Sequence, residues 1–519
     1  MNKKLIIIIS IVLVVLIAGG TAVFLLLRDR KSTEDEFLPS ESGFDAASGD
    51  LKSRKLTFYF IGQKFISPDE STSDEVLQAV NSRLKQELNT EVQFKIIYNQ
   101  TKGYLEEIKS DIAAGLPCDA FYYFSGFPVA LETLGNEGYI TDLSKLFPQG
   151  APNYYRQFTK DDIDAIKING KVYIIPARIP AAYSTCAIVR QDLMEKYNIP
   201  EIKSYADYEV FLKTIKENEP DMIPMNYIDT TLGLFADSYG YVRLDAALGL
   251  VYKWDDPDRK ILAWEQMPAF KECLNRIKSW RDNGYLMRSV GRVQSDREMI
   301  TSGKWASFIG GLGDHFSYNT DLRAKGITEW NYKAYQLSDG YSARLSPMEN
   351  GMAISAKSAN AKRVLMFIDW LESSQENYDL YMYGVKGKHY IEKEDYIEPA
   401  GGAGDAYSFF NWVWRNPLRN IDYERTNMPA YKAEKSQYYD IIMEKTKYPP
   451  LNGFRPDYST VDSINNSRRI SFADMERSVY IGDYDESKVD AYIKGQKDAG
   501  IDNLISVIQE QADQFRAGH

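Results

Sequence analysis

Between residues 56 and 124, strand-like segments alternate with amphipathic helical segments. The strand-like segments are rich in aromatic and β-branched residues and cover residues 56–61, 92–98 and 119–124. The two segments between them repeat apolar residues at helical spacing, first at Val76, Val80 and Leu84 and then at Leu105, Ile108 and Ile112. This β-α-β-α-β order predicts a parallel, doubly wound α/β sheet with right-handed crossovers.

Ligands of doubly wound sheets bind beyond the carboxyl ends of the strands. Three loops of this sequence are therefore the first places to expect binding residues. They are residues 62–64, residues 125–127 and residues 176–178, the last of which follows the apolar run 172–175. Arg178 is conspicuous there, because it stands between two apolar runs that both read as buried strands.

The chain is long enough for two or more structural units. It has 519 residues, whereas a single apolar core stops growing at roughly 250–300 residues. Helical spacing returns at residues 205–217, 267–282 and 501–508, and strand-like runs return at residues 305–311 and 350–358. The sequence contains no internal repeat and no low-complexity tract in this part of the chain.

Composition and motifs exclude several classes of function. The net charge is -11, and nucleic-acid-binding proteins instead concentrate Lys and Arg, so no nucleic-acid partner is expected. The three cysteines form no CxxC pair and the three histidines form no HExxH motif, so neither a metal nor a disulfide framework is predicted. The nucleotide-binding GxxxxGK[ST] motif and the esterase GxSxG motif are also absent from the sequence, and no cofactor is expected.

The amino terminus contains a long uncharged apolar segment. Residues 5–27 carry no charged side chain, and a helix of that length spans about 34 Å, enough to cross a bilayer core of about 30 Å. An uncleaved membrane anchor within residues 1–30 is favoured over a cleaved secretory signal, and both remain open. Residues 31–53 are polar, acidic and rich in turn-forming residues, which predicts a flexible linker.

Several stretches together resemble the extracellular solute-binding proteins of ABC importers. The resemblance is to the large carbohydrate-type members related to maltose-binding protein, and it extends from about residue 54 onward. It rests on the stretches DIAAGLPCDAFYYF, GNEGYITDLSKLF, INGKVYIIP, FKECLNRIKSWRDNGYL, SGKWASFIGG and NGMAISAKSANAKRVLMFIDWLES. The later stretches YGVKGKHY, NPLRNIDY, PPLNGF and DAGIDNLISVIQEQADQF are similar to the LipO-like branch of this family.

This resemblance implies a two-lobed, type II periplasmic-binding-protein-like fold that closes on a ligand between the lobes. The implied first lobe comprises residues 54–181 and 346–385, and the second comprises residues 182–345 and 386–519. The chain would cross between lobes near residues 181–184 and return near residues 346–351. The sequence departs from the family at its start, since the lipidated cysteine usual in members from single-membrane cells is replaced by a plain apolar segment.

Polar residues at strand ends are the first group of candidate ligand contacts. Gln63 and Lys64 follow the first strand, Ser125 follows the third, and Arg178 would point into the cleft at the first crossing. Arg178 has two open interpretations, a hydrogen-bond donor to a sugar hydroxyl or acidic ligand group, and a hinge salt bridge to Asp or Glu. Asp314 follows the glycine-rich loop GGLG, where it is either a hydroxyl acceptor or the acceptor that closes its own loop.

Aromatic residues form the second group of candidates, because a pyranose has apolar C–H faces beside its hydroxyls. Tyr123 ends the third strand and matches an aromatic cleft position of the family, although core packing is an alternative. Trp412 and Trp414 would share one face if FFNWVWRNP is a strand, as a stacking platform or as ordinary packing. Phe454 and Arg455 match the position where a tail aromatic reaches the cleft in the maltose-type proteins.

The combined interpretation is a monomeric, membrane-tethered or secreted protein on the extracellular face of the membrane. It would capture an oligosaccharide or related small solute by ligand-stabilised closure and deliver it to an ABC permease, without catalysis. Two alternatives remain open at this stage. One is a tethered glycan sensor or adhesion module, and the other is a glycoside hydrolase with two carboxylates, for which no motif isolates a pair.

Overall fold

The computed structural model describes residues 51–62, 70–98, 101–127, 129–178, 182–226, 236–286, 296–337, 343–393, 397–400, 412–414, 416 and 446–517. The apolar segment at residues 5–27 and nearly all of the polar segment after it lie outside these ranges. Within the described ranges, no helix has both the length and the apolar character that a membrane crossing requires.

A five-stranded sheet with the order β2-β1-β3-β15-β6 organises the first part of the chain. β1 (Arg54–Ile61) lies between β2 (Thr90–Ile97) and β3 (Ala120–Phe124) and runs parallel to both. β15 (Asn350–Ile354) lies antiparallel between β3 and β6 (Ile175–Pro176). The predicted parallel pairing of the first three strands is therefore confirmed, and a strand from much later in the chain completes the sheet.

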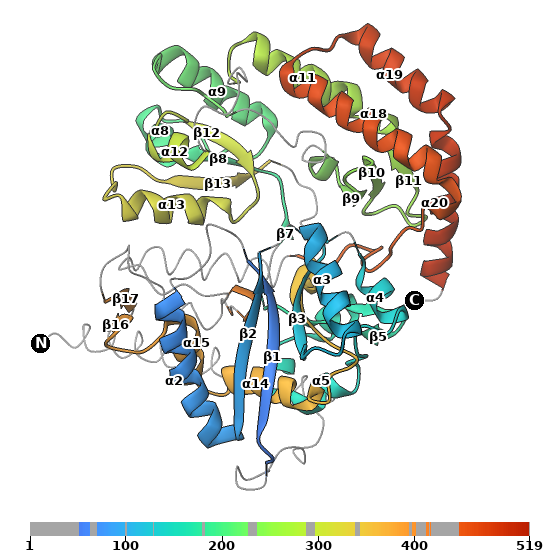
Figure 1. Ribbon diagram of the computed structural model, residues 1–519. Helices are drawn as coiled ribbons and strands as arrows, with labels where there is room; N and C mark the ends of the chain where they lie inside the picture. Colours follow the sequence, from blue (N-terminus) through green and yellow to red (C-terminus); the bar gives the residue numbers. More distant parts are fainter. Residues whose placement is uncertain are drawn as a thin grey trace, which may run out of the picture.

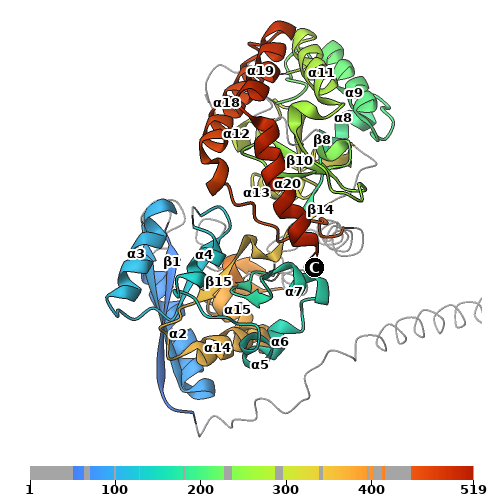
Figure 2. The same cartoon turned by 90° about the vertical axis from the view of Figure 1, so that its right-hand side faces the viewer.

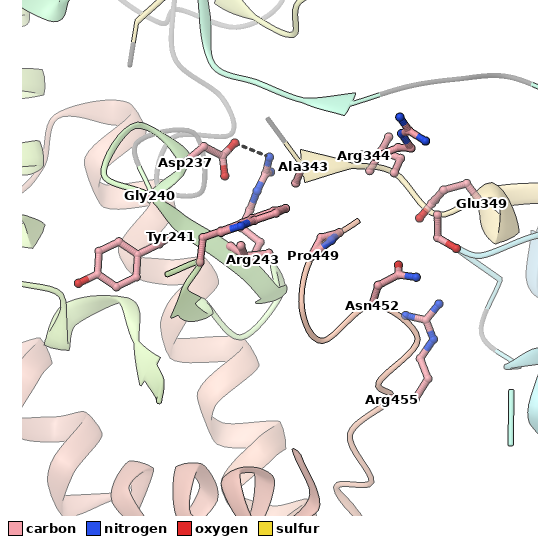
Figure 3. Close-up of a pocket in the computed structure, with 14 residues that line it drawn as sticks. Asp237, Gly240, Tyr241, Arg243, Ala343, Arg344, Glu349, Pro449, Asn452 and Arg455 are labelled. Carbon is pink, nitrogen blue, oxygen red and sulfur yellow. Dashed lines mark hydrogen bonds and ion pairs between the residues drawn. The ribbon is translucent and has the colours of Figure 1, made fainter. Parts of the chain in front are cut away.

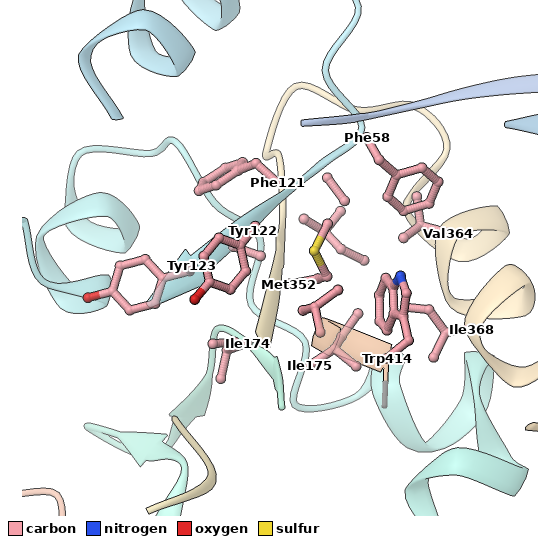
Figure 4. Packing of buried hydrophobic residues seen from close by; sticks show 14 of the residues in the cluster. Phe58, Phe121, Tyr122, Tyr123, Ile174, Ile175, Met352, Val364, Ile368 and Trp414 are labelled. Atoms are coloured by element: carbon pink, nitrogen blue, oxygen red, sulfur yellow. The ribbon is translucent and has the colours of Figure 1, made fainter. Parts of the chain in front are cut away.

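Helices cover this sheet and share its core. Side chains from α2 (Glu70–Leu88), α3 (Thr101–Ala113), α14 (Ala361–Ser373) and α15 (Gln375–Tyr383) pack with those of the strands in a single buried cluster. Figure 4 shows part of this cluster, where Phe58, Met352 and Val364 lie close together. Between β3 and β6 the chain forms α4 (Leu131–Asn136), α5 (Leu146–Gly150), α6 (Pro152–Tyr155), α7 (Lys160–Ala165), β4 (Lys167–Ile168) and β5 (Lys171–Val172).

We call this part the first unit. Its buried residues run from Leu56 to Ile175 and from Met348 to Ile397, and they include Val413 and Trp414. The second unit contains buried residues from Cys186 to Leu337 and from Leu451 to Ala512. Each of the four hydrophobic clusters among the described residues lies within one unit, and Figure 2 shows the two units as separate bodies.

The second unit is built on two antiparallel three-stranded sheets. One has the order β12-β8-β13 and consists of β8 (Cys186–Arg190), β12 (Ser307–Gly310) and β13 (Tyr332–Gln336). The other has the order β11-β10-β9 and consists of β9 (Tyr241–Asp245), β10 (Leu250–Lys253) and β11 (Ile261–Ala263). The helices are α8 (Gln191–Lys196), α9 (Tyr205–Asn218), α11 (Phe270–Asp282), α12 (Asp296–Thr301), α13 (Asp314–Ala324), α18 (Asp462–Ile481), α19 (Glu486–Asp498) and α20 (Ile501–Ala517).

Two short strands lie where the chain passes between the units. β7 (Ala182–Tyr183) carries the chain from β6 toward β8, and β14 (Ala343–Arg344) brings it back from β13 toward β15. The two strands pair antiparallel, and Figure 1 places β7 between the two bodies. A third described segment, residues 446–461, passes from this region into the carboxyl-terminal helices, which are red in Figures 1 and 2.

The packing after residue 385 differs from the boundary that the sequence suggested. Residues 386–519 were expected in the second lobe, but Tyr390, Ile397 and Trp414 are buried in the first unit. Trp414 packs edge-on against Phe367 of α14, with the ring centroids 6.4 Å apart. The chain therefore returns to the first core before it enters α18, because these large apolar side chains find their packing partners there.

The second unit contains a buried ion pair that fastens α18 to the turn after β11. Arg468 Nη1 and Nη2 donate to Glu265 Oε1 and Oε2 at 2.7 and 2.9 Å. Both side chains are almost fully buried, and Arg468 also donates from Nε to the Leu248 carbonyl and from Nη1 to Gln496. The two-pronged geometry satisfies both oxygens of the buried carboxylate.

Removing the buried cation should destabilise the second unit strongly. We expect Arg468→Met to lower the free energy of unfolding by about 3–5 kcal/mol, because Glu265 would remain buried without its counter-ion. Urea unfolding followed by circular dichroism measures this loss.

The neighbouring arginine provides the matched control. Arg469 is 3.4 Å from Asp245 and far more exposed, so Arg469→Met should cost less than about 1 kcal/mol. Equal, small losses for the two variants would contradict the importance of the buried pair.

Candidate functional site

A pocket of ≈ 120 Å³ lies where the returning strand β14, the loop before β9 and the tail segment meet. Its walls come from residues 237–243 together with Trp254, from residues 343–349 and from residues 449–455. Figure 3 shows Arg243, Arg344 and Arg455 with Asp237 and Glu349 around it. The pocket therefore combines charged groups with the partly exposed aromatic side chains of Tyr241 and Trp254.

Asp237 and Arg243 form an ion pair on one wall of the pocket. Arg243 Nη2 donates to Asp237 Oδ2 at 3.0 Å. Burial raises the pKa of Asp237 to about 6, while Arg243 and a hydrogen bond from Thr185 act in the opposite direction. Thr185 lies between β7 and β8, so this carboxylate also contacts the segment that enters the second unit.

A second polar cluster surrounds Asp162 of α7, on the side of the first unit. The Asp162 carboxylate accepts a hydrogen bond from Tyr448 Oη at 2.5 Å and faces Arg344 Nη1 at 3.5 Å. It also completes the capping box of α7 with Thr159. Arg344 in turn donates from Nε to Thr446 Oγ1 at 3.1 Å. This cluster joins the first unit, the crossing strand and the tail segment.

Arg178 lies two residues beyond β6, immediately before the crossing. Its side chain is only 7% exposed, and its Cζ lies 5.3 Å from the centroid of the Phe158 ring. Its buried Nε has no hydrogen-bond partner, and Arg178 forms no ion pair within the described part of the chain. Burial lowers the pKa of the Arg178 guanidinium, with Asp162 opposing this effect. The salt bridge considered from the sequence is thus not present among the described residues.

Ser125 and Tyr123 lie close to the pocket without lining it. Ser125 Oγ donates to Glu349 Oε2 at 2.5 Å, and its backbone N–H donates to the Glu349 carbonyl. Tyr123 is buried in β3, its hydroxyl donates to the Val129 carbonyl at 3.1 Å, and Figure 4 shows its ring among the core residues. Ser125 therefore reaches the pocket through Glu349, whereas Tyr123 takes the packing role that was its alternative.

Of the two predicted tail residues, one packs in a core and the other lines the pocket. Phe454 is buried and packs against Phe515 of α20 with the ring centroids 5.6 Å apart. Arg455 is exposed and lines the pocket. It forms no ion pair or hydrogen bond with any residue that the structure describes.

Asp314 opens α13 in the second unit and is not among the residues that line the pocket. Its Oδ2 accepts a hydrogen bond from the Gly311 backbone N–H at 2.8 Å. Asp314 therefore closes its own loop, which is one of the two roles that its sequence position suggested.

The two tryptophans do not form the predicted strand platform. Residues 412–414 form a short 3-10 helix instead of a strand, so the expected alternation of faces is wrong. Trp414 is 3% exposed and lies in the first core, as Figure 4 shows. The side chain of Trp412 lies outside the described residues, as do Gln63 and Lys64.

Two exposed aromatic residues at the sheet edge were missed by the sequence analysis. Tyr98 follows β2 and is 58% exposed, and Phe124 ends β3 and is 37% exposed. Tyr98 directly follows Ile97, which pairs with Ile61 at the end of β1, and Phe124 is the last residue of β3, so both residues lie at the carboxyl edge of the sheet. An aromatic residue at the last position of a parallel strand was the available signal.

Glycines allow these rings to lie close to the backbone. A Cβ on Gly62 would lie 2.5 Å from a ring atom of Tyr98, and a Cβ on Gly126 would lie 2.3 Å from a ring atom of Phe124. Phe124 also directly precedes Ser125, which contacts the pocket residue Glu349. The carboxyl edge of the first sheet thus presents two exposed aromatic side chains, and one of them, Phe124, is adjacent in the chain to a residue that contacts the pocket.

The raised pKa of Asp237 predicts a pH-dependent contribution to stability. Its folded pKa of about 6 exceeds the ordinary value of 3.8, so the native state holds this proton more tightly and loses stability as pH rises through this range. Between pH 5 and pH 7 we expect wild type to lose roughly 1 kcal/mol relative to Asp237→Asn. Urea unfolding at the two pH values measures the difference, and Asp474→Asn, an exposed position on α18, serves as control. A constant difference between wild type and Asp237→Asn across the range would contradict the assignment.

Comparison with known proteins identifies the family. Residues 82–387 match the model of the bacterial extracellular solute-binding proteins. A carbohydrate ABC transporter substrate-binding protein of Streptococcus pneumoniae is 22% identical over 395 residues, which cover 73% of this chain and 76% of that protein. The polygalacturonan/rhamnogalacturonan-binding protein YtcQ of Bacillus subtilis is 23% identical over 372 residues, which cover 68% of this chain and 72% of that protein.

Solved structures share the fold. The N-glycan transport solute-binding protein NgtS from Streptococcus pneumoniae has a TM-score of 0.73 and 20% identity, covering 90% of this chain and 99% of that chain. An extracellular solute-binding protein from Bifidobacterium longum subsp. infantis has a TM-score of 0.60 and 16% identity, covering 89% of this chain and 99% of that chain. The mixed α/β fold is therefore that of solute-binding proteins. Because the family model matches more than half of the length of this chain, the chain belongs to the bacterial extracellular solute-binding proteins.

Proposed function

We propose that this protein is the extracellular solute-binding component of an ABC importer and that it captures an oligosaccharide. Membership of the solute-binding family supports a binding role. The carbohydrate ABC transporter protein and YtcQ among its relatives support a carbohydrate solute, as do NgtS structures in complex with Man5GlcNAc and Man1GlcNAc. The solute would be passed unchanged to a membrane permease, so no catalytic residues are assigned.

The position of the pocket supports placing the ligand between the two units. Its walls come from the crossing strand, the second unit and the tail, and Glu349 connects it with Ser125 of the first unit. A ligand that contacts both units stabilises the arrangement in which they are closest. The mechanism is therefore hinge closure in a two-lobed, type II fold, with β7 and β14 as the hinge strands.

The lobes follow from the packing of the cores. We assign residues 54–181 and 346–385 to the first lobe, with the segment around Tyr390, Ile397 and Trp414 added to it. The second lobe then contains residues 182–345 and the carboxyl-terminal helices α18, α19 and α20. A monomer suffices for this mechanism, because both walls of the site come from one chain.

Ligand contacts combine apolar faces with hydrogen-bond donors. Tyr98 and Phe124 offer exposed rings on which the apolar face of a pyranose can stack. Ser125 and Arg455 supply a hydroxyl and a guanidinium at or beside the pocket, and Arg178 supplies a guanidinium just beyond β6 of the same sheet. The aromatic residues would provide apolar contact area for the sugar rings, and the polar residues would fix the orientation of the ligand through hydrogen bonds.

Residues 5–27 are assigned to delivery and attachment. As an uncleaved helix they would tether the binding protein to the outer face of the membrane, and as a cleaved signal they would release it. In both cases the solute-binding part acts outside the cell, which the extracellular family supports.

Titration calorimetry with a panel of oligosaccharides tests the proposed function. We expect at least one member to bind with a dissociation constant in the micromolar range or tighter and to be recovered intact. Binding should also raise the melting temperature, because the ligand binds the folded form. Absence of binding across neutral and acidic panels, or cleavage of the bound sugar, would contradict the proposal.

The aromatic edge gives a second, independent test. Phe124→Ala and Tyr98→Ala should each weaken binding by about two- to tenfold, since a lost stacking contact is worth about 0.5–1.5 kcal/mol. Ile481→Ala on α18 removes a similarly exposed apolar side chain far from the pocket, and its affinity should equal that of wild type. Equal affinities for all three variants would remove Tyr98 and Phe124 from the site.

A further inference from the structure

The region around the pocket contains more cations than carboxylates that can neutralise them. Arg243 is paired with Asp237, and Arg344 is paired with Asp162. The remaining pocket carboxylate, Glu349, accepts a hydrogen bond from the neutral Ser125 hydroxyl and forms no ion pair with any described residue. This leaves two further arginines without a counter-ion among the described residues, in a chain whose net charge is -11.

Arg178 is the first of these. A guanidinium is always protonated and is expensive to bury without hydrogen-bond partners. Arg178 is nevertheless buried, with only 7% of its surface exposed, and its Nε has no hydrogen-bond partner among the described residues. Its guanidinium lies over the face of the Phe158 ring. A cation–π contact offsets only part of the lost hydration.

Asp162, the carboxylate whose charge acts on Arg178, already has other partners. Asp162 already faces Arg344 at 3.5 Å, accepts from Tyr448 at 2.5 Å and caps α7 through the Thr159 backbone. Asp162 therefore attracts both Arg344 and Arg178, and the two arginines repel each other. Arg178 therefore has no carboxylate of its own among the described residues.

Arg455 is the second cation without an ion-pair partner among the described residues. It lines the same pocket as Arg344, the arginine whose charge also acts on Arg178. It belongs to the tail segment and lines the pocket with Glu349. Burial raises the pKa of the Tyr123 hydroxyl to about 12, and the positive charge of Arg455 opposes this effect. An exposed arginine at a pocket wall is free to reorient toward a ligand, whereas the buried Arg178 is already fixed in place.

We propose that the solute is an anionic oligosaccharide, and that Arg178 and Arg455 bind its acidic groups from the two sides of the crossing. The inference rests on the proposed function and narrows its substrate class to glycans with carboxylate substituents, such as uronic acid residues. Guanidinium groups bind carboxylates through paired N–H donors, so each acidic sugar ring would be held in a defined orientation. Closure around the acid would supply the counter-charge that Arg178 lacks in this structure.

Paired ligands test this class directly. Calorimetry would compare uronic acid oligosaccharides of several linkages with their methyl esters, which keep the ring and remove the charge. We expect at least one free acid to bind at least tenfold more tightly than its methyl ester, with the preference reduced at high salt. Binding of neutral oligosaccharides with no preference for the free acid would overturn this inference and leave the proposed function intact. Binding of neither class would instead overturn the proposed function.

Arginine variants locate the acidic group. Arg178→Gln and Arg455→Gln should each lower the affinity for the free acid by tenfold or more and leave the affinity for the methyl ester within about threefold. Arg469→Gln, at an arginine of α18 that does not line the pocket, should change neither affinity. Equal losses for acid and ester would show hydrogen bonding to hydroxyl groups instead, and would overturn the inference.

The melting temperature of the ligand-free protein provides a separate readout. Because Arg178 is buried without a counter-ion among the residues that the structure describes, Arg178→Gln should leave this temperature unchanged or raise it. A marked decrease would mean that Arg178 stabilises the fold through partners of its own, and would overturn its assignment as a ligand-binding cation.

Discussion

The antiparallel pairing of β7 with β14 is the contact on which the arrangement of the two units depends. Each strand has only two residues, so the pair supplies few hydrogen bonds and can act as a hinge. The Asp162 cluster strengthens it on one side, because Arg344 of β14 contacts α7 of the first unit and Thr446 of the tail. The Asp237–Arg243 pair and Thr185 lie on the other side, in the second unit. The crossing is therefore a polar joint between two apolar cores.

This polarity explains why the candidate site lies at the joint. The hydrophobic clusters among the described residues each stay within one unit, whereas the contacts that these residues make at the crossing are largely polar. The charged side chains near the joint can exchange their ion-pair and hydrogen-bond partners when the angle between the two units changes. A solute with hydroxyl and acidic groups is suited to this environment, since it supplies the acceptors that the arginines need.

The sequence predicted some elements well because their signals are local. The alternation of strands and helices between residues 56 and 124 follows from short-range periodicity, and the parallel pairing of β1 with β2 and β3 matches it. Family membership was also readable from stretches of sequence, and the family match over residues 82–387 confirms it. The 3-10 helix at Trp412–Trp414 was missed because an aromatic run between turn residues has no distinct period. Pocket residues such as Asp237, Glu349 and Asn452 come from distant segments, and no local pattern marks them.

The sequence alone therefore determined the α/β class, the family and the presence of Arg178 at the end of an apolar run. Periodicity, turn residues and motif order are sufficient for these conclusions. Only the tertiary structure decided that Arg178 lacks a partner among the described residues, that Phe454 and Trp414 are packed in cores, and that Tyr98 and Phe124 are exposed. These outcomes depend on which carboxylates and rings long-range folding brings together, since burial and pairing are properties of neighbours in space and not of neighbours in the chain.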